Sequence, residues 1–594
     1  MSDASPTFME RENLPPPAGH ANRCATFTAN KLQTGWLLIV MFLLSVLLRP
    51  AIAMADIYGI VVGINQYQSM PLDGPVNDAR DIADALKKVG AREVNLLLDG
   101  QAKRDNILKT WHDVLQKSKA NDLIVFTYAG HGGIEPEHFK GSEPSGNDST
   151  LLLGGFFPKG EGTYERIIDD EIAGLLKKAT DGKRSVIVVA DACHSGTMTR
   201  SLGNNSPVKL KVRAATYPPV VDDRLPPLDP KLNDLPKEFP DVLYFGAVKD
   251  DELAPEGNIE GNIRGALSWA FAKGLRGEAD LNNDGTITSE ELRVYVTEKV
   301  KTEMEGMQHP QSSGKTRDFT LNVKKEPPEP RSEPAAQGTP VPSSSPPLIG
   351  LAILNATTPV GELGKKIHGI KLIDPNSGQR PDLTWDLSRG LLFTDLGDVA
   401  STINEKAATD QASATRGLKR SQSATPAATG DETADLPNVQ NAVDKYGATE
   451  EIKRLITHNT LKMSLLPDDK LHRAGEKITF KIEGFDKTFF TLFNLASDGS
   501  VNFLYPLANA QTKDPLEIPL GKPYLLNLNV DPPFGADHIV AIASPTPLTA
   551  LHQALRQMDG QKLASKIPDL LRKNLTGTGW QMGIHGLYTG DKQP

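Results

Sequence analysis

Two short segments combine a thiol and an imidazole with the sequence pattern of buried strands. Residues 185–196 begin with an apolar run rich in β-branched residues, and Cys193 lies just past the end of that run. Residues 122–133 have the same pattern, and His131 lies just past the end of their apolar run. Such runs are typical of strands buried on both faces of a parallel sheet. Ligands bind outside the carboxyl ends of such strands. We therefore expect Cys193 and His131 at one edge, where a nucleophile and a base could carry out acyl transfer.

The N-terminal region bears on the role of Cys193. Residues 35–48 form an apolar run that is too short for a typical membrane span, and Ala53-Met54-Ala55 follows it. The pattern predicts a signal peptide and leader over 1–55, and hence a periplasmic or secreted protein, with an N-terminal membrane anchor as the alternative. Cleavage would remove Cys24 and leave Cys193 as the only thiol. A partnerless cysteine in an exported chain favours a reactive thiol over one that only packs as a small hydrophobe.

Apolar strands alternate with amphipathic helices around the two segments. The expected strands are 57–64, 93–98, one that starts at Asp122, one that starts at Ser185, and 241–248, and the expected helices lie near 77–89, 106–115, 172–178, 265–275 and 290–300. This order predicts an α/β fold, in which a mostly parallel sheet has helices on both faces. Residues 197–239 are rich in proline and charge and have no period, so we expect an exposed loop there. Residues 319–323 are expected to form an edge strand that closes the domain.

The chemistry-bearing residues resemble the caspase-like cysteine peptidases, most closely the metacaspases and bacterial caspase-family proteins. The matching pieces, in order, are Gly63-Ile64-Asn65, Val76-Asn77-Asp78-Ala79, Ala129-Gly130-His131-Gly132, Asp169-Asp170-Glu171 and Asp191-Ala192-Cys193-His194-Ser195-Gly196. The resemblance covers residues 56–323, a predicted peptidase domain. It implies that Cys193 is the nucleophile and that His131 is the general acid and base. It also implies an oxyanion hole formed by backbone N–H groups near Gly132 and Cys193.

An acidic residue beside the nucleophile suggests a preference for basic substrates. Asp191 lies two residues before Cys193, so both side chains are expected on one side of the strand end. A carboxylate there raises the pKa of the thiol, a poor arrangement unless a cationic substrate uses the charge. The resemblance implies that Asp191 and Asp78 line a pocket for Arg or Lys, whereas the alternative role of Asp78 is a helix N-cap. The loop after Cys193 then offers candidate self-cleavage sites at Arg200, Lys209, Lys211 and Arg213.

A calcium-binding loop is predicted inside the peptidase domain. Residues 280–291 match the EF-hand pattern, with ligands expected from Asp280, Asn282, Asp284, Thr286 (through its carbonyl) and Glu291. The expected cofactor is a structural or regulatory Ca²⁺ ion, with a metal-free turn as the alternative, and no organic cofactor is expected. The resemblance to metacaspases implies a second calcium site, for which Asp169 and Asp170 match. The acidic residue expected after the nucleophile falls near Arg200, which departs from that pattern.

Two low-complexity stretches divide the remaining chain. Residues 324–347 form a Pro-rich linker and residues 407–438 a second linker. They flank a β-rich segment over 348–406 and precede a C-terminal β-rich module over 439–594. We expect this module to be β-sandwich-like, with a helix over 551–567 that Pro568 ends.

The C-terminal module resembles a β-rich module of unknown function found behind bacterial caspase-like domains. The resemblance rests on Phe493-Asn494, Asp498-Gly499 and Phe503-Leu504-Tyr505-Pro506. Because the sequence of the module contains no catalytic cluster, we expect it to bind an unknown protein or envelope partner.

The sequence therefore predicts an exported, caspase-like cysteine endopeptidase that cleaves protein or peptide substrates after Arg or Lys, with self-processing and an influence of calcium. The alternative is an inactive caspase-like domain that serves as a calcium-dependent interaction protein. A thiol redox protein is disfavoured because the mature chain would lack a second cysteine. The net charge of -9 gives no support for nucleic-acid binding.

Overall fold

The computed structural model describes most of the chain after residue 54. The described residues are 55–590 apart from 142, 144, 194–206, 209–210, 237, 250–251, 306, 317–320, 323–347, 405–431, 457–459, 468–470, 508–514, 533 and 577–578. The predicted signal peptide and leader up to residue 54, Arg200, Lys209 and the predicted Pro-rich linker therefore lie outside the described residues, as does most of the predicted second linker. Among the helices that are described, none is both long and apolar enough to cross a membrane.

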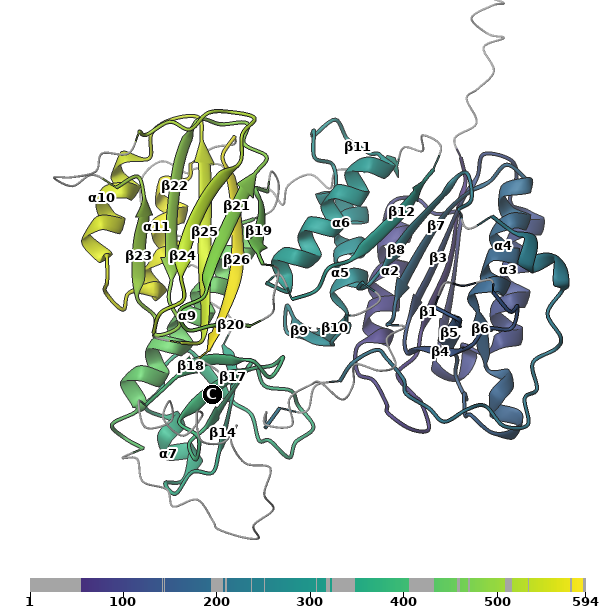
Figure 1. The fold of residues 1–594 in the computed structure, drawn as a ribbon, viewed down its shortest axis with the longest axis horizontal. Coiled ribbons are helices and arrows are strands. Elements are labelled where there is room, and N and C mark those ends of the chain that lie inside the picture. The colour runs from purple at the N-terminus through teal and green to yellow at the C-terminus, as the bar shows by residue number, and fades with distance from the viewer. Residues whose placement is uncertain are drawn as a thin grey trace, which may run out of the picture. The chain divides into compact units, whose positions relative to one another are not determined.

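A six-stranded sheet in the order β12-β8-β7-β3-β1-β2 forms the centre of the N-terminal domain (Figure 1). Its strands are β1 (Ile57–Gly63), β2 (Glu93–Leu98), β3 (Leu123–Ala129), β7 (Ser185–Asp191), β8 (Val242–Gly246) and β12 (Gln311–Lys315). Neighbouring strands pair in parallel, except that β12 is antiparallel to β8. The mostly parallel sheet is thus confirmed. A strand does lie within the range predicted for the edge strand, but its expected position was wrong: β13 (Leu321–Asn322) pairs with β11 (Thr286–Ile287), and β12 closes the main sheet instead.

Helices cover both faces of this sheet, as predicted (Figure 1). One face carries α2 (Pro75–Lys88), α5 (Ala266–Lys273) and α6 (Ser289–Glu303), and the other carries α3 (Arg104–Lys117) and α4 (Asp169–Asp181). Alternate strand residues enter the two cores: Val61 packs with the first group of helices and Ile60 with the second. Because both faces are buried, these strands read as continuous apolar runs.

Two features of the N-terminal domain differ from the prediction. The polar region after β3 contains a small antiparallel sheet of β4 (Gly132–Pro136), β5 (Asn147–Leu152) and β6 (Arg166–Ile168). The region predicted as an exposed loop over 197–239 is not exposed throughout, because residues 213–215 are buried. Their burial results from contacts with the candidate active site, which local sequence does not reveal.

The described residues after the first linker form three further sheets. A five-stranded mixed sheet comprises β14 (Ile349–Leu354), β15 (Ile370–Leu372), β16 (Leu383–Asp386), β17 (Leu391–Thr394) and β18 (Val399–Thr402). It shares a core with α7 (Val360–Gly364) and α9 (Leu436–Leu455). The next sheet has three strands, β19 (Lys462–Leu466), β21 (Lys477–Glu483) and β24 (Tyr524–Asn529). The last has five, β20 (His472–Arg473), β22 (Phe489–Leu495), β23 (Val501–Tyr505), β25 (Ala536–Ser544) and β26 (Gln581–Gly590).

The last two sheets pack against each other and confirm the β-sandwich-like fold. Phe480 of β21 and Leu492 of β22 lie in one buried cluster, which lies between the sheets. The predicted helix over 551–567 was wrong in its extent. Helix α10 (Thr549–Met558) ends early, and Pro568 stands in the first turn of a second helix, α11 (Ile567–Asn574). Proline is tolerated there because the first N–H groups of a helix have no intrahelical partner.

Candidate active site

The sheet register brings the two predicted catalytic residues to the same edge. Ala129 of β3 pairs with Asp191 of β7, and His131 and Cys193 each follow two residues later. Cys193 is fully buried, and its Sγ accepts a hydrogen bond from the N–H of Ala254 (2.7 Å). Burial raises the pKa of the Cys193 thiol to about 12, so the thiol is neutral in this arrangement.

His131 is held in one orientation and one tautomer. Its Nε2 lies 2.7 Å from the carbonyl oxygen of Met70, and since that oxygen can only accept, Nε2 carries the proton. Among the described residues, the buried Nδ1 has no hydrogen-bond partner. The ring also packs against Tyr67, with 4.6 Å between centroids. Burial lowers the pKa of His131 to about 4. The neutral ring therefore has a free Nδ1 lone pair that can accept a proton.

Met70 contacts the predicted catalytic histidine, which the sequence did not indicate. It acts through its backbone carbonyl, so its side-chain type carries no signal. Its φ of 60° lies in the left-handed region, which is uncommon for a residue with a side chain. Residues in such conformations cluster at functional sites, where the surroundings hold them in place.

Two backbone N–H groups converge on one carbonyl oxygen at this edge. The oxygen of Arg213 accepts hydrogen bonds from the N–H of Gly132 (2.9 Å) and from the N–H of Cys193 (3.1 Å). These are the two groups for which an oxyanion hole was predicted. Donors at such distances from a carbonyl oxygen can stabilise the negative charge that develops on it during acyl transfer.

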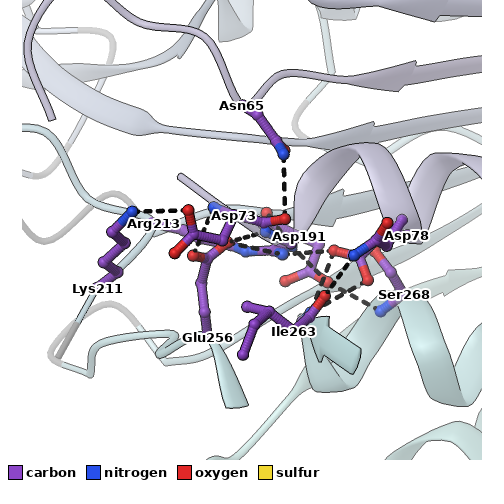
Figure 2. A network of polar contacts seen from close by, with 12 residues as sticks. Asn65, Asp73, Asp78, Asp191, Lys211, Arg213, Glu256, Ile263 and Ser268 are labelled. Atoms are coloured by element: carbon purple, nitrogen blue, oxygen red, sulfur yellow. Dashed lines mark hydrogen bonds and ion pairs between the residues drawn. The ribbon is translucent and has the colours of Figure 1, made fainter. Parts of the chain in front are cut away.

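The side chain of Arg213 lies among three buried carboxylates (Figure 2). It forms a close ion pair with Asp78, and it lies 2.9 Å from Asp191 and 3.5 Å from Glu256. The structure thus brings Asp78 and Asp191 together, and it adds Glu256, which no motif indicated. Burial raises the pKa of Asp78 to about 7 even though Arg213 lowers it. The pocket therefore strongly favours a cation.

Helix ends and one glycine build this pocket. Gly74 is the N-cap of α2, so Asp78 lies within the helix and the N-cap role was wrong. The carboxylate of Asp78 instead accepts the N–H of Gly265 (3.1 Å), and that of Asp191 accepts the N–H of Ser268 in α5 (2.9 Å). A Cβ atom at Gly265 would lie 2.4 Å from Nη1 of the guanidinium, so only glycine leaves room there.

Glu256 links the pocket to the backbone beside it. Its carboxylate accepts the N–H groups of Asp73 and Gly74 (both 2.9 Å). Its own N–H donates to the carbonyl of Lys211 (3.0 Å). The N–H of Arg213 donates to the carbonyl of Ala254 (3.0 Å). Residues 211–213 therefore pair with residues 254–256 as a short antiparallel strand, a common way to bind an extended peptide.

The predicted calcium loop has the expected turn but only part of a ligand arrangement. The carboxylate of Asp280 accepts the N–H groups of Asp284 (3.0 Å) and Gly285 (2.9 Å). One oxygen of Glu291 caps α6 by accepting the N–H of Thr288 (2.9 Å), whereas its other oxygen, Oε1, is buried and has no partner among the described residues. The predicted metal ligands in this loop are all oxygen atoms, which suits Ca²⁺.

A second acidic cluster lies beside β5 and α4. One ligand atom each from Asp148, Asp169 and Asp170 lie within 4.8 Å of one another. The sequence resemblance had pointed to Asp169 and Asp170, whereas Asp148 was not foreseen. His138 also reaches this cluster, with its Nδ1 2.8 Å from Asp148.

Comparison with known proteins gives two matches to protein families. The caspase domain family matches residues 58–321, and a domain of unknown function (DUF4384) matches residues 472–547. The chain is 27% identical to metacaspase-1 of Eremothecium gossypii over 257 residues, which cover 36% of this chain and 56% of that protein. It is 26% identical to metacaspase-1A of Aspergillus oryzae over 263 residues, which cover 36% and 59%. The chain thus spans less than two thirds of the length of these curated relatives.

Solved structures show more distant similarity. Protein GSU0716 from Geobacter sulfurreducens aligns with a TM-score of 0.31 and 20% identity, over 44% of this chain and 95% of that chain. Caspase-1 from Spodoptera frugiperda aligns with a TM-score of 0.28 and 14% identity, over 46% and 90%.

Proposed function

Because residues 58–321 match the caspase domain family, we propose that this chain is a caspase-like cysteine endopeptidase that cleaves after Arg or Lys. The observation that carries the proposal is the position of Arg213. Its carbonyl oxygen accepts two N–H groups beside Cys193, while its side chain lies among three carboxylates. A substrate residue requires this combination, with the reacting carbonyl at the oxyanion donors and the side chain in a specificity pocket.

In the proposed mechanism, Sγ of Cys193 attacks the carbonyl carbon of the residue that precedes the cut bond. Nδ1 of His131 accepts the thiol proton and passes it to the leaving amine. The N–H groups of Gly132 and Cys193 bind the oxyanion. Water then hydrolyses the thioester, with His131 as the base, and the carbonyl of Met70 keeps the ring in its tautomer throughout.

The pocket chemistry supports a preference for Arg. A guanidinium presents several donors in a fixed plane, and here it reaches Asp78, Asp191 and Glu256 from its two Nη atoms. A Lys ammonium could form ion pairs in the same pocket but would reach fewer of these oxygens at once. An Asp side chain would add a fourth negative charge to a buried site and is excluded on electrostatic grounds.

The same geometry supports self-processing at one bond. Arg213 was one of four candidate sites after Cys193, and Lys211 was another. Lys211 pairs with Asp73 at a half-exposed position, whereas Arg213 occupies the buried pocket. The proposed cut therefore falls between Arg213 and Ala214.

We also propose that calcium influences the domain, through the loop over 280–291 or the cluster of Asp148, Asp169 and Asp170. The donor chemistry of both places supports this. Calcium would supply charge neutralisation there, whereas the proposed catalytic steps use only residues of the chain. For the remaining regions, the leader sequence supports export, and the β-rich module behind the peptidase domain supports a role in binding a partner.

One experiment tests the enzyme, its specificity and its self-processing together. Full-length wild-type and Cys193→Ala chains are incubated with fluorogenic peptides that end in Arg, Lys or Asp, with and without calcium, and the chains are followed on gels. We expect turnover of Arg peptides and a cut after Arg213 in the wild type alone.

Asp191→Asn should lower kcat/KM for Arg peptides about ten- to hundredfold, because it removes a buried charge-assisted hydrogen bond. The matched control Asp181→Asn changes an exposed carboxylate of α4. No turnover and no cut under any condition would favour the alternative, a calcium-dependent interaction protein.

A further inference from the structure

The segment that follows Arg213 is bound as closely as Arg213 itself. Ala214 and Ala215 are 2% and 5% exposed. The N–H of Ala215 donates to the carbonyl of Gly132 (2.8 Å), and Ala214 forms a parallel bridge with the same glycine. The backbone of Gly132 therefore holds the chain on both sides of the proposed cut, because its N–H binds the Arg213 carbonyl.

Tyr217 occupies a subsite two residues further along. Its ring meets Phe156 edge to face, with 5.0 Å between centroids, and its hydroxyl lies 3.2 Å from Oγ1 of Thr150. A Cβ atom at Gly133 would come within 2.7 Å of the Tyr217 ring, so the ring rests directly on the backbone of this glycine. Burial raises the pKa of Tyr217 to about 12, so its hydroxyl stays protonated. An aromatic ring, a hydroxyl and a bare backbone thus form a pocket that matches one aromatic side chain.

From these contacts we infer that the peptidase also selects its substrates by residues after the cut, with small residues at the first two positions and an aromatic residue at the fourth. The inference rests on the proposed function. Its physical basis is that residues 214 and 215 are enclosed with only a methyl side chain each, and that the fourth position has a shaped aromatic pocket. The substrate class is therefore a segment with the pattern Arg, small, small, any residue, aromatic.

The contact on the other side of the cut is weaker. The ion pair between Lys211 and Asp73 (2.8 Å) joins side chains that are 37% and 49% exposed. Exposed ion pairs contribute little, because water and salt screen them. We therefore assign the additional selectivity to the residues after the cut.

The test varies the residues of the natural segment in quenched fluorescent peptides. The parent peptide has the sequence of residues 210–219, and full-length protein is the enzyme. Replacing the tyrosine with Ser is expected to lower kcat/KM about tenfold, and Phe should restore most of it, because the ring contact remains. Replacing the alanine after Arg with Leu should lower it at least about tenfold, because a larger side chain does not fit an enclosed position.

Protein variants connect the preference to the pocket. Phe156→Ala should reduce the ratio of kcat/KM between the Tyr and Ser peptides to near one, whereas Phe157→Ala, which changes the 41%-exposed neighbour, should leave the ratio unchanged. A short Arg-coumarin peptide, which has nothing after the cut, tests the proposed function separately. If this short peptide is cleaved but the Tyr and Ser peptides react equally in wild-type protein, the selectivity inference is overturned and the peptidase stands. If neither peptide type is cleaved and the chain itself is not cut after Arg213, both fail.

Discussion

Removing the resident guanidinium tests the pocket most directly. Arg213→Ala would leave Asp78, Asp191 and Glu256 buried without their cation. Breaking a buried ion pair by removing one partner costs about 3–5 kcal/mol. Because the pKa of Asp78 is already about 7, this carboxyl takes up a proton and limits the loss. We therefore expect a loss of about 3 kcal/mol in the free energy of unfolding near neutral pH.

The same pocket sets the sign of the pH dependence. The pKa of Asp78 is 3.8 in its ordinary state and about 7 in the folded chain, where burial raises it. Between these values the folded chain holds a proton that the unfolded chain has released, so stability falls as pH rises through this window. The charge of Arg213 lowers the pKa of Asp78, so its removal raises that pKa and extends the window above pH 7. The stability difference between Arg213→Ala and its parent should therefore widen as pH increases.

The measurement is urea unfolding in a Cys193→Ala background, which prevents self-cleavage. The matched control is Arg224→Ala, because Arg224 is 55% exposed and pairs only loosely with Glu161 (3.6 Å). Agmatine, a small guanidinium compound, should restore about 2.7 kcal/mol to Arg213→Ala at a hundred times its Kd, and nothing to the control. If Arg213→Ala unfolds at the same urea concentration as its parent at every pH, and agmatine has no effect, the pocket does not have the proposed electrostatics.

Two further predictions concern the base and calcium. Burial lowers the pKa of His131 to about 4, and a protonated ring cannot accept the thiol proton. The rate of self-cleavage, followed on gels, should therefore stay level from neutral pH to about pH 5 and fall only near pH 4. A fall in rate centred near pH 6.5 would contradict the burial of His131. Glu291→Gln should weaken calcium binding to the full chain in calorimetry, whereas Glu290→Gln, at an exposed neighbour, should not; equal affinities would rule out the loop as a calcium site.

Much of the fold follows from residue pattern alone. Strands β1, β3 and β7 are buried on both faces, so their apolar runs are visible in the sequence. Strand β12 has the sequence Gln-Ser-Ser-Gly-Lys and lies at the sheet edge with little burial. Its existence depends on pairing with β8, a tertiary effect that no local pattern encodes.

The site divides in the same way. His131, Cys193, Asp78 and Asp191 belong to motifs, and their placement follows from strand ends and a helix start. Met70 contributes only a carbonyl group, and Glu256 lies in a segment without a motif. The sequence offered Arg213 only as one of four basic residues at which the chain could cut itself. Its burial and the two hydrogen bonds to its carbonyl oxygen distinguish it, and both appear only in the structure.

The strand pairing of residues 211–213 has a kinetic consequence, because it does not depend on the bond to Ala214. After a cut, Arg213 would be the last residue of the fragment that also contains Cys193, and it would stay within reach of its pocket. A tethered ligand of this kind has an effective concentration of about millimolar order. Peptides supplied at micromolar concentration would compete poorly against it. The apparent KM would then report departure of the chain's own segment rather than affinity for the peptide, and a competent peptidase would look nearly inactive in a routine assay.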